Sequence, residues 1–84
     1  MTRERFEQAF LEFLRKRNEA PALSVSAADN LFHLGLLDSF AIPHLITHLE
    51  CALGTQLDLE RGGLETFFSI ERAFRAYSSD VHAG

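Results

Sequence analysis

The first stretch of the chain with a clear hydrophobic pattern lies between residues 3 and 17. Apolar side chains recur there at spacings of three and four, and charged residues occupy many of the other positions. The apolar positions are Phe6, Ala9, Phe10, Phe13 and Leu14. This spacing places them on one face of an α-helix. The pattern predicts an amphipathic helix from about Arg3 to Arg17, ended by Asn18 and Pro21.

A second segment with helical spacing is predicted to run from about Ser39 to Leu53. Its N-cap is expected at Ser39 or Asp38, and Gly54 is expected to end it. The apolar stripe consists of Ile42, Leu45, Ile46, Leu49, Ala52 and Leu53. Pro43 falls within the first turn, where a missing N–H costs little, so a slightly irregular first turn is expected.

A last helix is predicted to follow Ser69, its expected N-cap. The core face of this helix consists of Ile70, Ala73, Phe74 and Tyr77. A single helical turn is expected at residues 64–68, and residues 78–84 are expected to form a frayed tail. No run of strict alternation is long enough for a sheet. The predicted fold class is therefore all-α, a small bundle of three main helices plus one short helix.

The connection between the first two helices is long. Residues 19–38 are rich in loop and turn formers, including Pro21, Ser24, Ser26, Asp29 and Asn30. A structureless loop of this length is unusual in a compact domain. Five apolar residues near its end offer a way to hold it against the core: Leu31, Phe32, Leu34, Leu36 and Leu37. A long but anchored first loop is therefore predicted.

The composition indicates one folded domain, expected to span residues 1–84. Hydrophobic residues make up 46% of the chain, with eight Phe, which supports a core. The formal net charge of -4 gives no basic excess, so no nucleic-acid partner is expected. Polar residues directly follow Met1 and no apolar run approaches the ~20 residues of a membrane span, so neither a signal peptide nor a membrane span is expected. A single cysteine, Cys51, precludes an internal disulfide and is compatible with the reducing cytoplasm. With Met at its start and a polar tail at its end, the chain is expected to be a freestanding protein, with an excised domain as the alternative.

The most informative motif is Gly35-Leu36-Leu37-Asp38-Ser39-Phe40. A glycine marks a loop, two leucines follow, and an Asp-Ser pair opens the second helix. The Ser39 hydroxyl is therefore expected at the N-terminal end of that helix. Unpaired N–H groups and the helix dipole attract anions to such an end, which favours a phosphate ester there. A simpler interpretation is that Asp38 or Ser39 serves only as an N-cap.

The longer run from Asn30 to Phe40, its position and the chain length resemble the prosthetic-group site of acyl and peptidyl carrier proteins. The resemblance covers nearly the whole chain, from the N-terminal helix through the long loop to the final helix. It implies that Ser39 carries 4′-phosphopantetheine donated by coenzyme A, and that Asp38 helps the attaching enzyme engage the carrier. Gly35 and Leu37 match the loop residues that present the serine, and Phe40 matches an apolar residue beside the arm.

The function implied by this resemblance is that of a freestanding carrier, not an enzyme. The arm holds an acyl group as a thioester, and the chemistry belongs to the arm and to the partner enzymes. The implied partners are a phosphopantetheinyl transferase, a ligase that loads an acyl or aminoacyl group, and downstream synthase or transferase enzymes. The expected docking residues are Leu37, Phe40, Ala41, His44, Thr47 and His48. The second helix is poor in acidic residues, unlike that of fatty-acid carriers. This favours a specialised pathway of the polyketide, nonribosomal peptide or D-alanyl type.

Several residues have other interpretations. His44 and His48 lie four positions apart, but no third metal ligand has a suitable spacing, so an exposed pair that faces partners is expected, without a metal. Cys51 is expected to be a small inert hydrophobe. A hydrolase built on Ser39 and Asp38 is disfavoured, because adjacent triad members have poor geometry and no Gly-x-Ser-x-Gly motif is present. The alternative from another class is an unmodified helical interaction module with the same fold.

Overall fold

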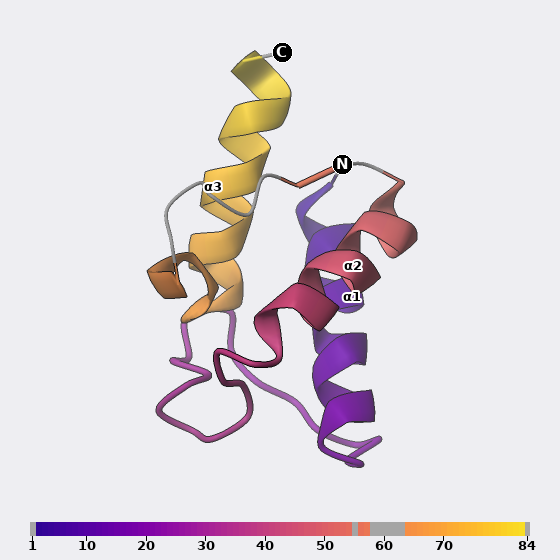
Figure 1. The fold of residues 1–84 in the computed structure, drawn as a ribbon, viewed down its shortest axis with the longest axis vertical. Helices are drawn as coiled ribbons and strands as arrows, with labels where there is room; N and C mark the ends of the chain where they lie inside the picture. The colour runs from indigo at the N-terminus through magenta and orange to yellow at the C-terminus, as the bar shows by residue number, and fades with distance from the viewer. Residues whose placement is uncertain (1, 55, 58–63, 84) are drawn as a thin grey trace.

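The computed structural model describes residues 2–54, 56–57 and 64–83. These residues contain three α-helices, α1 (Arg3–Arg17), α2 (Ile42–Leu53) and α3 (Ile70–Ala83), and one 3-10 helix, η1 (Leu64–Phe67). The chain runs downward along α1 and upward along α2 and α3 in Figure 1. α1 packs against both α2 and α3, while η1 packs against α3. The predicted all-α class is confirmed for the described ranges, which contain no strand.

α1 has the predicted bounds, and polar side chains satisfy both of its ends. Thr2 is the N-cap, and its hydroxyl oxygen accepts a hydrogen bond from the Arg5 N–H at 3.2 Å. At the other end, the side-chain amide of Asn18 donates to the Leu14 carbonyl at 2.8 Å. The buried residues of α1 are Phe6, Ala9, Phe10 and Leu14. The apolar stripe seen in the sequence is therefore the face that α1 buries.

Arg3 ties the start of α1 to the start of α3. Its Nε lies 3.0 Å from Glu7 Oε2, and its Nη2 lies 3.4 Å from Glu71 Oε1. The guanidinium also stacks over the Phe74 ring, 5.5 Å from the centroid. The hydrogen bonds to Glu7 and Glu71 raise the pKa of Arg3 above its ordinary value.

α2 begins three residues later than predicted. Its N-cap is Ala41, whose side chain makes no capping hydrogen bond, and Pro43 is its second residue. A proline deeper in a helix clashes with the carbonyl four residues earlier and lacks an N–H. Pro43 therefore favours a helix that begins no more than a turn before it. The prediction that Ser39 or Asp38 is the N-cap of α2 is therefore wrong. Gly54 ends the helix with a φ of 67°, as predicted.

α3 begins where the sequence places it. The Ser69 hydroxyl oxygen accepts a hydrogen bond from the Arg72 N–H at 3.1 Å, which caps the first turn. Ile70, Ala73 and Tyr77 are buried. The helix continues through residues 78–83, which the sequence pattern assigned to a tail, because no Gly or Pro interrupts that stretch. No helix among the described residues is long and apolar enough to cross a membrane.

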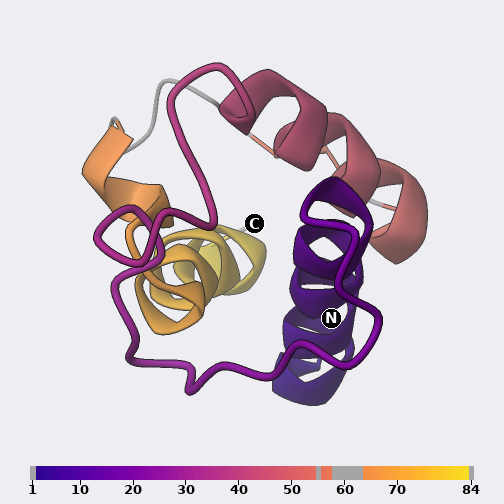
Figure 2. The ribbon, with the colours of Figure 1, turned by 90° about the horizontal axis from the view of Figure 1, so that it is seen from below.

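The long loop between α1 and α2 passes beside η1 and α3 before it returns to α2 (Figure 2). The Leu31 N–H donates to the Phe68 carbonyl at 2.7 Å, and the Glu71 N–H donates to the Ala27 carbonyl at 2.9 Å. Leu31 is fully buried, and the ring centroids of Phe32 and Phe68 lie 5.0 Å apart. The middle of the loop is thus anchored where η1 meets α3.

The core joins residues that lie far apart in the chain. Its largest fully buried side chains are Tyr77, Phe6, Phe10, Phe67, Leu14, Leu31, Leu45 and Leu49. They come from all three α-helices, η1 and the long loop. Burial of each large apolar side chain contributes about 1.5–3 kcal/mol relative to leaving it exposed. No single helix buries its apolar face alone, so the elements stabilise one another.

Candidate functional site

Ser39 lies in a turn between the long loop and α2. The Asp38 carbonyl accepts a hydrogen bond from the Ala41 N–H at 3.1 Å, and the Ser39 carbonyl accepts one from the Ile42 N–H at 3.4 Å. The side chain of Ser39 is exposed. Within the described ranges its hydroxyl makes no hydrogen bond. The hydroxyl is therefore accessible from solvent.

Both carboxylate oxygens of Asp38 have partners. Oδ1 accepts a hydrogen bond from the Ala41 N–H at 3.0 Å, and Oδ2 lies 2.7 Å from Arg17 Nη2. The first contact caps the turn as an N-cap side chain caps a helix. The second is a charge-assisted bond that joins the end of α1 to this turn. Side-chain exposures of 35% for Arg17 and 54% for Asp38 keep the ion pair largely solvated, so it contributes less than about 1 kcal/mol.

Three neighbouring features set the path of the chain toward Ser39. Gly35 has a φ of 75°, a left-handed conformation that a β-carbon disfavours. A β-carbon there would meet nothing within 4 Å, so backbone conformation rather than space selects glycine. The Asn18 side-chain amide donates to the Leu36 carbonyl at 3.2 Å, and Leu37 is only 3% exposed. The end of α1 and the core thus hold the segment that precedes the turn.

Five of the six predicted docking residues fall into two groups, exposed and buried. Phe40 is 87% exposed, and His44 and Thr47 are also exposed. Leu37 and Ala41, by contrast, are buried. The expectation that Ala41 is available to partners at the surface is wrong, because this residue precedes Leu45 and Leu49 on the buried side of α2. Of the loop residues expected to pack inward, Leu34 is 55% exposed and adds to the apolar surface.

His48 faces α1 rather than solvent. Its Nε2 lies 3.0 Å from the Ala9 carbonyl oxygen, and its ring centroid lies 5.7 Å from the ring centroid of Phe13. The expected exposed pair of His44 and His48 is therefore not formed, because packing against α1 occupies His48. The part of the chain that the structure describes holds no group of three or more His, Cys, Asp or Glu residues able to bind a metal ion.

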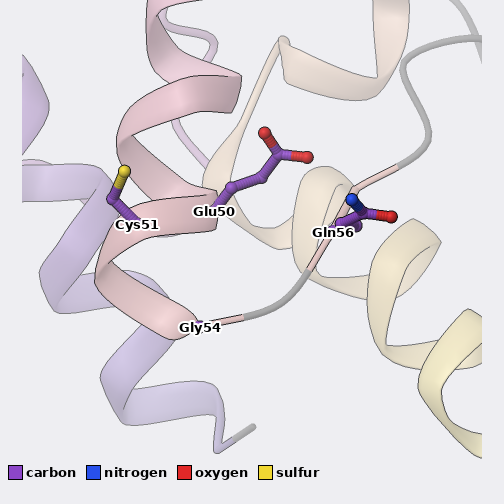
Figure 3. A pocket seen from close by; sticks show the side chains of 4 residues that line it. All are labelled: Glu50, Cys51, Gly54 and Gln56. Atoms are coloured by element: carbon purple, nitrogen blue, oxygen red, sulfur yellow. The ribbon is translucent and has the colours of Figure 1, made fainter.

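Cys51 lies in the last turn of α2, whereas Ser39 precedes the first turn of that helix. Its side chain is exposed and therefore takes no part in the core. An open hollow is lined there by Glu50, Cys51, Gly54 and Gln56 (Figure 3). The Glu50 carboxylate accepts a hydrogen bond from the Leu57 N–H at 2.9 Å, so it serves to hold the chain beyond α2.

Arg17 and Asn18 are the site residues that sequence reasoning missed. Their only signal in the sequence is a polar and basic end to the first helix, which the helix dipole and the cap already explain. Comparisons with known proteins add no family, because no protein-family model, curated protein or solved structure matches the chain. The Ser39 turn is the described feature on which a functional proposal depends.

Proposed function

We propose that this protein is a carrier of the acyl and peptidyl carrier type, with Ser39 as the attachment site for 4′-phosphopantetheine. The observation that carries the proposal is the exposed Ser39 hydroxyl within the motif from Gly35 to Phe40, at the turn that leads into α2. An all-helical arrangement with a long, anchored first loop supports it. The carrier acts in the cytoplasm and has no catalytic residues of its own.

The residues around Ser39 fit a phosphate ester. The Ser39 hydroxyl is exposed to solvent. The positively charged guanidinium of Arg17 contacts Asp38, the residue next to Ser39. In the attachment reaction, Ser39 Oγ forms a bond to the phosphorus next to pantetheine in coenzyme A. The bond from that phosphorus to the rest of the pyrophosphate breaks, adenosine 3′,5′-bisphosphate leaves, and the hydroxyl proton is lost. The attached arm supplies a terminal thiol that holds acyl groups as thioesters.

The exposed residues beside Ser39 are the proposed contacts for partner enzymes. Phe40 presents an apolar ring next to the site, and His44 and Thr47 follow on the exposed side of α2. The first turn of α2 contains no acidic residue, and in the unmodified chain Asp38 is paired with Arg17. Docking driven by negative charge is therefore not favoured, which fits a specialised polyketide, nonribosomal peptide or D-alanyl pathway. The partners are a phosphopantetheinyl transferase, a loading ligase and downstream synthases, and each contact is small and brief.

Intact-protein mass spectrometry tests this proposal. The chain is incubated with coenzyme A, Mg²⁺ and a broad-specificity phosphopantetheinyl transferase. We expect the wild type to gain one phosphopantetheine and Ser39→Ala to gain none. Ser24→Ala, which removes an exposed hydroxyl from the long loop, is the matched control and should gain one.

Two outcomes would contradict the proposal. One is modification of Ser39→Ala at the wild-type rate. The other is no gain on folded wild-type protein while the same transferase modifies a known carrier. The second outcome would favour an unmodified interaction module that docks through exposed residues such as Phe40.

A further inference from the structure

Arg17 directly contacts the residue that precedes Ser39. Its Nη2 lies 2.7 Å from Asp38 Oδ2, and its side chain makes no other hydrogen bond or ion pair within the described ranges. A guanidinium carries five N–H donors in a rigid fork, so the others remain available. The side chain is 35% exposed, so part of the guanidinium or its stem is accessible from solvent.

The turn keeps other anchors if Arg17 changes its partner. Asp38 Oδ1 is held independently by the Ala41 N–H at 3.0 Å. Asn18 holds the Leu36 carbonyl at 3.2 Å, just before the turn. The contact of Arg17 with Asp38 is therefore not the sole support of the turn, and its loss would leave these two contacts in place.

Electrostatic repulsion would favour a change of partner by Arg17. A phosphate ester on Ser39 would add negative charge to the residue that directly follows Asp38, whose carboxylate is also negative, and like charges repel. The two other basic residues in the last turn of α1 are engaged elsewhere. Arg15 Nε donates to the Leu23 carbonyl at 2.8 Å, and Lys16 Nζ lies 3.4 Å from Glu12 Oε1. Phosphate accepts a bidentate pair of bonds from an arginine fork.

We propose that Arg17 binds the phosphate of a phosphate ester on Ser39, in place of its bond to Asp38 or together with it. The phosphodiester form of this inference rests on the proposed carrier function. A phosphoserine at the same position presents the same chemistry and does not require that function. In the carrier, Arg17 would hold the base of the arm against the end of α1.

The test uses two samples of the full chain. In one, a transferase attaches phosphopantetheine to Ser39; in the other, genetic code expansion places phosphoserine at position 39, so no transferase is needed. Each is made as wild type, Arg17→Gln and Arg5→Gln. Arg5→Gln is the matched control, because it removes the same charge from an exposed position on α1.

The first readout is the second pKa of the phosphoserine, which ³¹P NMR follows through the range near 6. A nearby cation favours the doubly charged form and lowers this pKa. Arg17→Gln should therefore raise it by roughly half a unit or more, and Arg5→Gln should leave it unchanged. Arg17→Gln also leaves the Asp38 carboxylate unpaired, and that negative charge could by itself raise the phosphoserine pKa. The comparison is therefore repeated in an Asp38→Asn background, where the rise in the pKa should persist. The second readout is the Arg17 Nε–H signal, which should shift in both modified samples.

The outcomes separate the two proposals. An unchanged pKa in Arg17→Gln, with no shift of the Arg17 signal in either sample, overturns the phosphate contact even if the transferase modifies Ser39. If the transferase leaves Ser39 unmodified but phosphoserine shows the Arg17-dependent changes, the phosphate contact stands and the carrier proposal fails.

Discussion

Replacement of Asp38 offers a test of how the Ser39 turn is held. Asp38→Ala removes two contacts at once, the cap on the Ala41 N–H at 3.0 Å and the ion pair with Arg17 at 2.7 Å. Loss of a cap costs about 0.5–2 kcal/mol, and loss of an exposed ion pair costs about 0.2–1 kcal/mol. The free energy of unfolding should fall by about 1–2 kcal/mol. Asp38→Asn keeps an oxygen that accepts from Ala41 and loses only the charge, so it should cost less than about 1 kcal/mol.

Urea denaturation followed by far-ultraviolet circular dichroism measures these differences. Arg17→Gln should match Asp38→Asn, and the double variant should cost no more than either, because both remove the same ion pair. Thermal unfolding should agree, at about 4–8 °C per kcal/mol for a domain of this size. High salt should narrow the gap between wild type and Arg17→Gln. Asp38→Asn keeps the cap on the Ala41 N–H and Asp38→Ala does not. Equal losses of stability in the two variants would therefore show that this cap does not stabilise the turn.

Three further substitutions probe the core, the approach to Ser39 and the exposed surface. Leu45→Ala, at a fully buried position in α2, should lower the free energy of unfolding by about 2–5 kcal/mol in urea; a loss below 1 kcal/mol would contradict the packing of α2 on the core. Gly35→Ala should lower the free energy of unfolding by about 1–2 kcal/mol, because the φ of 75° at this position is unfavourable for a residue with a β-carbon. Asn tolerates this conformation better than Ala, so Gly35→Asn should lower it by less in the same assay. Phe40→Ala, at an 87% exposed residue, should change stability by less than about 0.5 kcal/mol yet raise the KM of the transferase for the carrier, and an unchanged KM would remove Phe40 from the proposed docking surface.

The late start of α2 changes how the candidate site is understood. The sequence pattern expects the Ser39 hydroxyl at the N-terminal end of a helix, where N–H groups and the helix dipole attract phosphate. In the structure α2 begins at Ile42, and two N–H groups of the turn are already bonded, Ala41 to Asp38 and Ile42 to the Ser39 carbonyl. If Ser39 carries a phosphate, as proposed, the helix end would contribute less to holding it than the sequence pattern indicates, and the proposed contact with Arg17 would contribute more.

Local sequence signals predicted most of the elements. The spacing of apolar residues set the bounds of α1, Ser69 marked the start of α3, and Gly54 marked the end of α2. Each of these signals acts within about one helical turn, so a short stretch of sequence contains all of it. The start of α2 was predicted incorrectly because two local signals compete there. The capping tendency of Asp38 and Ser39 favours an earlier start, and Pro43 opposes it.

The sequence by itself determined the all-helical class, the apolar faces and the motif that contains Ser39. Only the tertiary structure decided which polar groups from distant parts of the chain meet. Arg17 reaches Asp38 across 21 positions, His48 reaches the Ala9 carbonyl across 39, and Arg3 reaches Glu71 across 68. Such contacts leave no periodic trace in the chain, because they depend on how whole helices pack. The same packing buried Ala41 and turned His48 inward, while it left Phe40 beside Ser39 in solvent.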